Sequence, residues 1–256
     1  MMIDGLSGTY NITRCSSAAH TGSIRSVSVK LAVSALAAFF AGYIFIPLGG
    51  MCLKGSTAGY VISACGPLCS IVLLFGAVMF YKKSFRKTML ELGFRRFPCK
   101  TLLWGLPLAI VLTLLGGAVT LLWGYIGEKL NWDLGVPPTV EAAMSDKPAE
   151  VIALLVTALL AAPVFEEIFF RRMIYGTLLK ALPQSSAAFS AALIFAATHL
   201  SPLQLPGLCL LGFIWQKYYI KSRTLWTTVI LHFFNNAIAA GLLLLLRFTG
   251  NDFITH

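Results

Sequence analysis

The sequence predicts an all-α fold: a polytopic membrane helical bundle of about seven or eight transmembrane helices. Of its 256 residues, 57% are hydrophobic and only 12% are charged, which is the composition of a membrane protein rather than of a soluble domain. The hydrophobic residues form continuous runs, several of them close to the roughly 20 residues that cross a hydrocarbon layer about 30 Å thick. Strands of a membrane barrel would alternate instead, so a barrel is not expected.

Basic side chains predict the orientation of these spans. The chain has a formal net charge of +10, and residues 82–100 carry seven Lys and Arg side chains against the single acid Glu91. Short basic loops stay on the cytoplasmic side of a membrane. We therefore place this loop inside, and its charge does not call for a nucleic-acid partner.

The N-terminal part of the chain is predicted to contain a polar tail and three spans. Residues 1–30 are serine-rich and poor in acid, and we expect a disordered cytoplasmic tail. The Gly66-Pro67 pair is expected to bend the second span. The three spans of the N-terminal transmembrane region, residues 31–127, are 31–53, 58–81 and 101–127.

The C-terminal part, residues 150–246, is predicted to contain four further spans. A loop with a net acidic charge and Pro137-Pro138 separates it from the first region, and we place this loop outside. Arg171 and Arg172 are expected to mark the cytoplasmic end of the fourth span. The four spans are 151–170, 187–200, 205–219 and 226–246.

Glu166 and Glu167 are the two acids that the sequence places inside a hydrophobic span, while the other eight fall in predicted loops or termini. Ionisable groups in a bilayer are costly and usually mark a functional site. Glu167 and Arg171 are four residues apart and so share a helix face, where a charge pair can fix both side chains. Glu166 has only apolar neighbours at that spacing and is a candidate general acid or base. A purely structural salt-bridge network is the alternative.

Two of the four histidines fall in predicted spans with polar or small neighbours. His199 follows Ala196 and Ala197, small residues that let another helix approach closely. His232 and Asn236 are four residues apart on the last span and share one face. A lone histidine in a helix is more often a packed, hydrogen-bonded residue, and that interpretation stays open at this point.

Together these side chains are suited to hydrolysis of a peptide bond. A glutamate and a histidine can hold and deprotonate a water molecule, and a second histidine with an asparagine can stabilise the oxyanion. The sequence contains no HExxH or GxSxG motif, and its cysteines show no metal-ligand spacing. However, Glu166, His199 and His232 can also bind a metal such as zinc. The residues alone leave both options open.

Three motifs in order, each on its own span, resemble the CPBP family of membrane proteins. They are Glu166-Glu167-x-x-x-Arg171, Phe195-x-x-x-His199 and His232-x-x-x-Asn236. The family includes type II CAAX prenyl endopeptidases and the bacterial Abi and lysostaphin-resistance-like proteins. The resemblance covers about residues 150–240. It implies a helical bundle around a polar intramembrane chamber, and endoproteolysis in or near the membrane, with 150–246 as the catalytic core.

The resemblance also implies a role for each matched residue. Glu166 would be the catalytic glutamate and His199 its partner in activating water. His232 and Asn236 would stabilise the oxyanion, with Glu167 and Arg171 as supporting residues. We favour a glutamate mechanism without a metal, so no cofactor is expected, although zinc remains the alternative. Counting along the spans raises one difficulty, because His199 lies about 10–15 Å further across the membrane than Glu166 and His232.

The sequence thus predicts a multi-pass intramembrane endopeptidase, with the lipid bilayer and a membrane-anchored or lipidated peptide as partners. A prenylated CAAX-type protein is one such substrate. The alternative is a non-catalytic immunity or interaction protein of the same family. A proton-coupled transporter is a third class, but it would usually show a pseudo-repeat, and none is visible. The compact chain favours a bacterial cytoplasmic membrane over a eukaryotic endomembrane.

Overall fold

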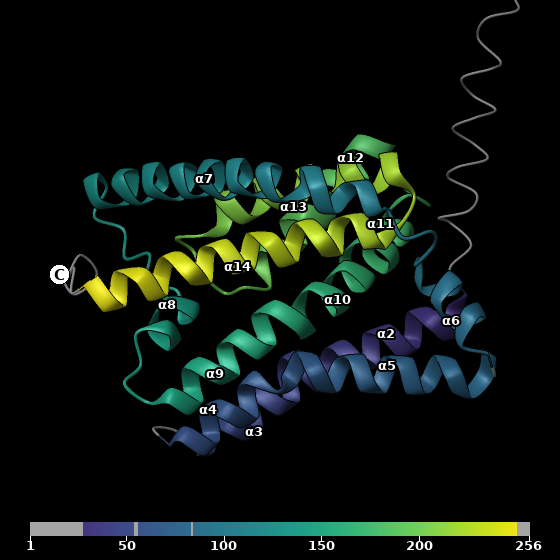
Figure 1. Cartoon of the computed structure of the whole chain (residues 1–256), viewed down its shortest axis with the longest axis horizontal. Helices are drawn as coiled ribbons and strands as arrows, with labels where there is room; N and C mark the ends of the chain where they lie inside the picture. The colour runs from purple at the N-terminus through teal and green to yellow at the C-terminus, as the bar shows by residue number, and fades with distance from the viewer. Residues whose placement is uncertain (1–27, 54–55, 83, 250–256) are drawn as a thin grey trace, which may run out of the picture.

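The computed structural model describes residues 28–53, 56–82 and 84–249, and the regular elements within these ranges are all helical. The helices run roughly along the long axis of the molecule (Figure 1). The predicted all-α membrane bundle is confirmed. Most of the expected N-terminal tail, residues 1–27, lies outside the described residues.

Five helices in the described part of the chain are long and apolar enough to cross a membrane. The other two expected spans are present as shorter or more polar helices. Helix α12 (Gln184–Ala197) has 14 residues, which gives a length of about 21 Å, and α13 (Leu205–Ser222) includes Lys217 and Lys221. The five long helices are Val29–Gly50, Thr57–Lys82, Cys99–Lys129, Pro148–Leu178 and Leu225–Thr249.

The first two long helices form a hairpin, and a serine caps the N-terminus of each helix. Ser28 Oγ accepts a hydrogen bond from the backbone N–H of Leu31, and Ser56 Oγ accepts one from Gly59; such caps satisfy N–H groups that lack a partner in the helix. The helix break at Cys65, just before Gly66-Pro67, agrees with the expected bend. The segments of the hairpin are α2 (Val29–Phe40), η1 (Ala41–Phe45), α3 (Ile46–Met51), α4 (Thr57–Ala64) and α5 (Gly66–Lys82).

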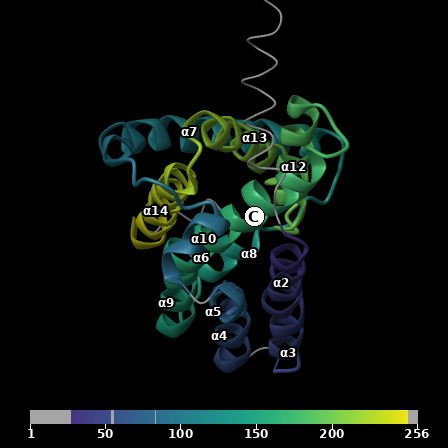
Figure 2. The same cartoon turned by 90° about the vertical axis from the view of Figure 1, so that its right-hand side faces the viewer.

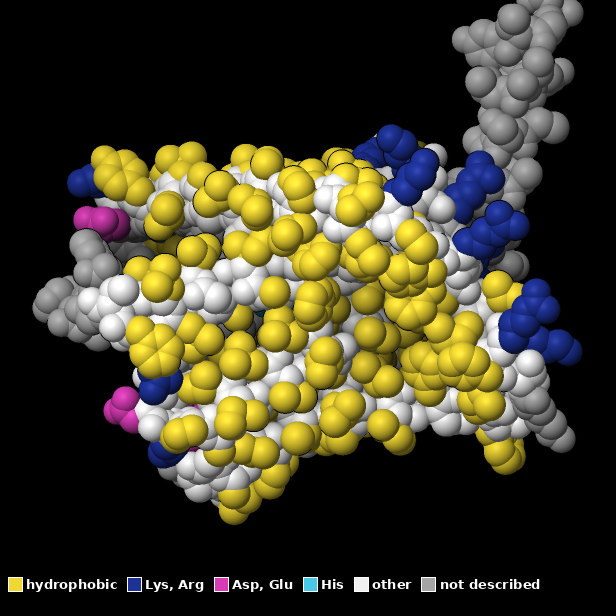
Figure 3. All heavy atoms as spheres, viewed as in Figure 1, with side chains coloured by type: hydrophobic (Ala, Val, Ile, Leu, Met, Phe, Trp, Pro, Cys, Tyr) yellow, Lys and Arg dark blue, Asp and Glu magenta, His cyan; other side chains and the backbone are white. Residues whose placement is uncertain are grey.

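A short basic helix connects this hairpin to the rest of the bundle. Helix α6 (Phe85–Leu92) ends at Gly93, whose φ of 101° is a backbone conformation that suits glycine. Helix α7 (Cys99–Lys129) follows, and α8 (Pro138–Ala143) lies at the opposite end of the molecule (Figure 1). Lys and Arg side chains gather at the end near α6 (Figure 3). This is the end that the sequence predicts to face the cytoplasm.

The fourth long helix runs through the middle of the bundle and continues further than the sequence suggested. It was expected to end at Arg171-Arg172, but it extends to Leu178, and both arginines are buried. The charges do not stop the helix, because Arg171 pairs with Glu167 and Arg172 Nε donates to the carbonyl of Glu91. Its segments are α9 (Pro148–Val156), η2 (Thr157–Ala161), α10 (Ala162–Glu166), η3 (Glu167–Ile174) and α11 (Tyr175–Leu178).

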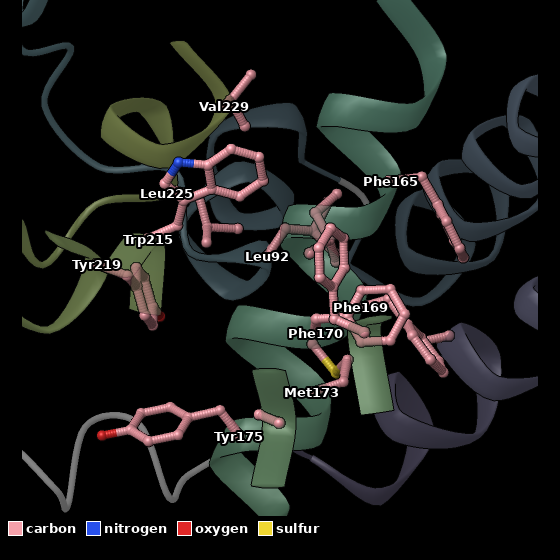
Figure 4. Close-up of a cluster of buried hydrophobic side chains, with 14 of the residues drawn as sticks. Leu92, Phe165, Phe169, Phe170, Met173, Tyr175, Trp215, Tyr219, Leu225 and Val229 are labelled. Carbon is pink, nitrogen blue, oxygen red and sulfur yellow. The ribbon is translucent and has the colours of Figure 1, made fainter. Parts of the chain in front are cut away.

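This central helix contacts the N-terminal hairpin on one side and α12 and α14 (Leu225–Thr249) on the other. Viewed along the bundle, α10 lies between the hairpin and the layer that contains α7, α12 and α13 (Figure 2). Its side chains Phe165, Phe169 and Phe170 form the middle of a buried aromatic cluster (Figure 4). Glu166 and Glu167 are therefore held by packing on both sides of their helix.

Candidate active site

Glu167 is fully buried and has a partner at each carboxylate oxygen. Its Oε2 lies 3.1 Å from Arg171 Nε, and its Oε1 lies 3.1 Å from His232 Nδ1. The Arg171 N–H groups are not aligned with Oε2, so the first contact is an ion pair rather than a well-directed hydrogen bond. The four-residue spacing seen in the sequence produces this pair because it repeats close to one helical turn.

Arg171 is enclosed by aromatic rings as well as by its ion pair. Its guanidinium carbon lies 4.7 Å from the centre of the Phe195 ring and 5.6 Å from that of Trp215. Aromatic faces attract cations at these distances. The arginine is thus kept charged inside the bundle, where it fixes the orientation of Glu167.

Glu166 has a different environment, in which only one of its oxygens has a hydrogen bond. The hydroxyl of Tyr43, on η1, donates to Oε1 at 2.8 Å. Oε2 is buried, has no hydrogen-bond partner among the described residues, and lies 3.9 Å from His232 Nε2. That distance is too long for a direct hydrogen bond, but a single water molecule can contact both atoms.

His232 joins the two glutamates. Because the carboxylate of Glu167 can only accept, the Nδ1 atom of His232 is the donor of their hydrogen bond. This leaves Nε2 on the side of Glu166. The imidazole is further held against the Trp215 ring, with centroids 4.5 Å apart. Arg171, Glu167, His232, Glu166 and Tyr43 thus form one continuous chain of polar contacts.

Asn236 lies one turn after His232 on α14 and is held by the central helix. Its side-chain amide donates to the carbonyl of Ala158 at 2.8 Å. The preceding residue, Asn235, accepts a hydrogen bond from Thr113 on α7 at 2.9 Å. These two asparagines connect three long helices at the level of the site.

His199 is half-buried at the end of α12 and is not bonded to the chain of contacts above. Its Nδ1 donates to the carbonyl of Phe195 at 2.9 Å, which leaves Nε2 as the acceptor of a neutral ring. The Phe195 ring contacts both histidine rings, with its centroid 4.8 Å from that of His199 and 6.1 Å from that of His232. The structure therefore brings Glu166, Glu167, Arg171 and His232 together, with Asn236 one turn away, but does not join His199 to Glu166 directly.

The sequence did not identify Tyr43 or Trp215 as parts of the site. Tyr43 lies in the middle of the first long hydrophobic run, 123 residues from its partner Glu166. A signal for it does exist, because a tyrosine hydroxyl inside a membrane span requires a hydrogen-bond partner. The spacing of residues along the chain cannot say which partner that is.

The donor set does not fit a resident metal ion in its present arrangement. Within the described ranges, no three His, Cys, Asp or Glu side chains are placed so that they can hold a metal. Glu166 and His232 approach each other, but His199 does not join them.

Residues 148–238 match the protein family described as type II CAAX prenyl endopeptidase Rce1-like. No curated protein and no solved structure is similar enough to count as a match. The matched residues contain the central helix, both glutamates, both site histidines and Asn236. Fold and site together define a polytopic membrane protein with a buried carboxylate–histidine centre. This match supports, for residues 148–238, the resemblance to the CPBP family that the three motifs predicted.

Proposed function

We propose that this protein is an intramembrane endopeptidase that uses Glu166 to activate a water molecule. The observation that carries the proposal is the unequal state of the two oxygens of Glu166. Tyr43 donates to one, while the other is buried without a hydrogen-bond partner among the described residues, 3.9 Å from His232 Nε2. A carboxylate oxygen of this kind is an available proton acceptor.

The remaining roles are those that the resemblance implies for the matched residues. His232 and Asn236 stabilise the oxyanion that forms when water attacks the peptide carbonyl. With a second proton on His232, Nε2–H is a donor, and the charges of Glu166, Glu167, Arg171 and His232 then sum to zero. His199 assists in water activation through Nε2, and a second water must bridge Nε2 to the water at Glu166. Glu167 and Arg171 hold His232 in place.

The substrate class follows from the position of the site inside a membrane bundle. Apolar side chains cover the outer face of the long helices (Figure 3), so a substrate that reaches Glu166 from the bilayer is itself membrane-anchored or lipidated. A prenylated CAAX-type protein satisfies this condition, and so does a small membrane peptide. We place the protein in a bacterial cytoplasmic membrane.

The test compares the membrane peptidomes of cells that carry the wild type, Glu166→Gln or Glu150→Gln at matched expression. Glu150→Gln is the control, because it changes the same residue type on the same long helix, where Glu150 pairs with Lys147 at 3.2 Å. We expect new peptide ends in the wild type and the control that vanish in Glu166→Gln. Identical peptidomes, together with full rescue of the wild-type phenotype by Glu166→Gln, would leave an immunity or interaction role as the better explanation.

A further inference from the structure

Tyr43 is the one hydrogen-bond donor to Glu166 in the described structure that comes from outside the matched domain. We propose that Tyr43 is a positioning residue, whose hydroxyl holds Oε1 of Glu166 so that Oε2 is the oxygen that receives the proton of the attacking water. This inference rests on the proposed function. It makes the N-terminal hairpin a working part of the site rather than a membrane anchor alone.

The carboxylate of Glu166 needs such a donor because its own torsions do not fix it. The last side-chain torsion of a glutamate is broad, so either oxygen can turn toward a substrate. The hydrogen bond of 2.8 Å from Tyr43 assigns Oε1 to the hairpin. Oε2 is then left on the side of His232 Nε2, at 3.9 Å. One donor thus decides which oxygen is the base and where the water must lie.

The ring of Tyr43 is held rigidly enough to perform this task. It stacks on Phe39 with centroids 5.1 Å apart and on Phe165 with centroids 5.5 Å apart. Phe39 stacks in turn on Phe169, at 4.4 Å. Stacked rings leave the hydroxyl free to point at Glu166 while the ring itself cannot tilt without disturbing its neighbours.

The backbone around Tyr43 is built for close approach to the next helix. Gly42 and Gly66 cross so tightly that a Cβ on either would overlap the other's carbonyl. Ser70 Oγ also donates to the carbonyl of Ala38 at 2.8 Å, which ties α5 to α2. Small residues and serine bonds of this kind fix helix pairs in membranes. The crossing therefore fixes Tyr43 relative to α5, which also contacts α10, the segment that carries Glu166.

The π-helical segments give an independent reason to connect this region with the site. Such segments are rare and often occur at functional positions. Within the described ranges there are three, and each supplies a contact to the same cluster. Tyr43 comes from η1, the carbonyl of Ala158 that binds Asn236 comes from η2, and Glu167 opens η3.

The test measures cleavage by purified wild type, Tyr43→Phe, Tyr60→Phe and Glu166→Gln in lipid nanodiscs. The probe is a synthetic peptide whose fluorescence is quenched until it is cleaved. It contains the bond that the comparison of membrane peptidomes identifies as cleaved by the wild type but not by Glu166→Gln. Tyr60→Phe is the matched control: it removes a hydroxyl from the same hairpin, near Glu150, which lies about 24 Å from Glu166 along the central helix.

We expect Tyr43→Phe to lower kcat about 10- to 100-fold, the effect of losing a hydrogen bond to a charged group. KM should stay close to the wild-type value, because phenylalanine preserves the stacked rings. The melting temperature should fall by several degrees, because Glu166 Oε1 loses its donor. Tyr60→Phe should match the wild type in all three quantities. A residue with only a packing role would tolerate phenylalanine without loss of kcat.

The possible failures are distinguishable. If the wild type shows no cleavage that depends on Glu166, both the proposed function and this inference are wrong. Wild type and Tyr43→Phe with equal kcat, while Glu166→Gln is inactive, would overturn the role of Tyr43 alone. If Tyr43→Phe does not fold, fluorotyrosine at position 43 keeps the shape and changes only the strength of the donor. A changed kcat with that residue supports the inference, and an unchanged kcat contradicts it.

Discussion

The two halves of the site, around Glu167 and around Glu166, differ in whether both carboxylate oxygens have a close partner. Glu167 is fully buried, and both of its oxygens have partners, Arg171 and His232, from within the matched domain. Glu166 has one oxygen bonded to Tyr43 from outside that domain and one oxygen with no hydrogen bond among the described residues. A carboxylate with a close partner at each oxygen, here an ion pair and a hydrogen bond, can hold a structure together. A carboxylate with one oxygen that lacks a close partner can still accept a proton. We therefore propose that Glu167 belongs to the scaffold and Glu166 to the chemistry.

The largest expected effect comes from removing the free oxygen. Glu166→Gln replaces the proton acceptor by an amide of the same shape, to which Tyr43 can still donate through Oε1. We expect cleavage to fall about 10²- to 10⁴-fold, the usual share of a general base, with little change in melting temperature. Initial rates and thermal unfolding in detergent measure both. If the Glu166→Gln protein cleaves at the wild-type rate, Glu166 is not the proton acceptor, and the two glutamates do not differ in role as proposed.

Glu167→Gln should act on stability instead. It leaves Arg171 as a buried charge without its carboxylate partner, which costs about 3–5 kcal/mol. Chemical unfolding in mixed micelles measures this difference. The control is Glu91→Gln, whose ion pair with Lys82 at 3.5 Å is partly exposed and is expected to contribute only about 0–1 kcal/mol. Equal unfolding curves for the two variants would mean that Glu167 is not a scaffold residue.

A smaller effect is expected where the scaffold meets α7. Thr113→Val removes the hydroxyl that donates to Asn235 Oδ1 at 2.9 Å and should reduce the free energy of unfolding by about 1 kcal/mol. Thr249→Val, at the exposed end of α14, serves as the control and should change little. If Thr113→Val lowers kcat as strongly as Glu166→Gln does, the hydrogen bond from Thr113 to Asn235 is needed for catalysis, and its role is not limited to stability.

Metal removal is expected to have no effect on Glu166-dependent cleavage. The described side chains do not gather three metal ligands at the site, and the proposed mechanism routes no step through an ion. Phenanthroline added to the nanodisc assay checks this directly. Loss of cleavage that is restored by added zinc would contradict this expectation. It would show that His199 and His232 bind a metal together with Glu166, which would then be a metal ligand.

The features of this structure that the sequence predicts are relations between residues close together in the chain. The spans followed from continuous apolar runs, and the contact between Glu167 and Arg171 followed from a spacing of four residues. Asn236 lies one turn from His232 for the same reason. Each of these relations is fixed by helix geometry alone, so one sequence is enough to derive it.

The parts that escaped prediction depend on how distant helices pack. Tyr43 meets Glu166 across 123 residues of sequence. The close crossing of Gly42 and Gly66, which holds the helix of Tyr43 against α5, cannot be derived from the spacing of residues. Arg171 and Arg172 predict the cytoplasmic end of a span because basic residues gather on that side of a membrane. Inside the bundle Arg171 is instead enclosed by Phe195 and Trp215, which come from two other helices. The division into separate regions 31–127 and 150–246 stays a prediction.

The most direct test of the account is to follow the oxygen of the attacking water. Purified wild type, Glu166→Gln and Glu91→Gln are incubated in nanodiscs with a membrane peptide extract, in water labelled with heavy oxygen. Mass spectrometry then reads the new carboxyl ends. We expect heavy oxygen at newly formed ends with the wild type and Glu91→Gln, and none with Glu166→Gln. Equal labelling by all three proteins, or no new ends with any of them, would contradict hydrolysis by Glu166.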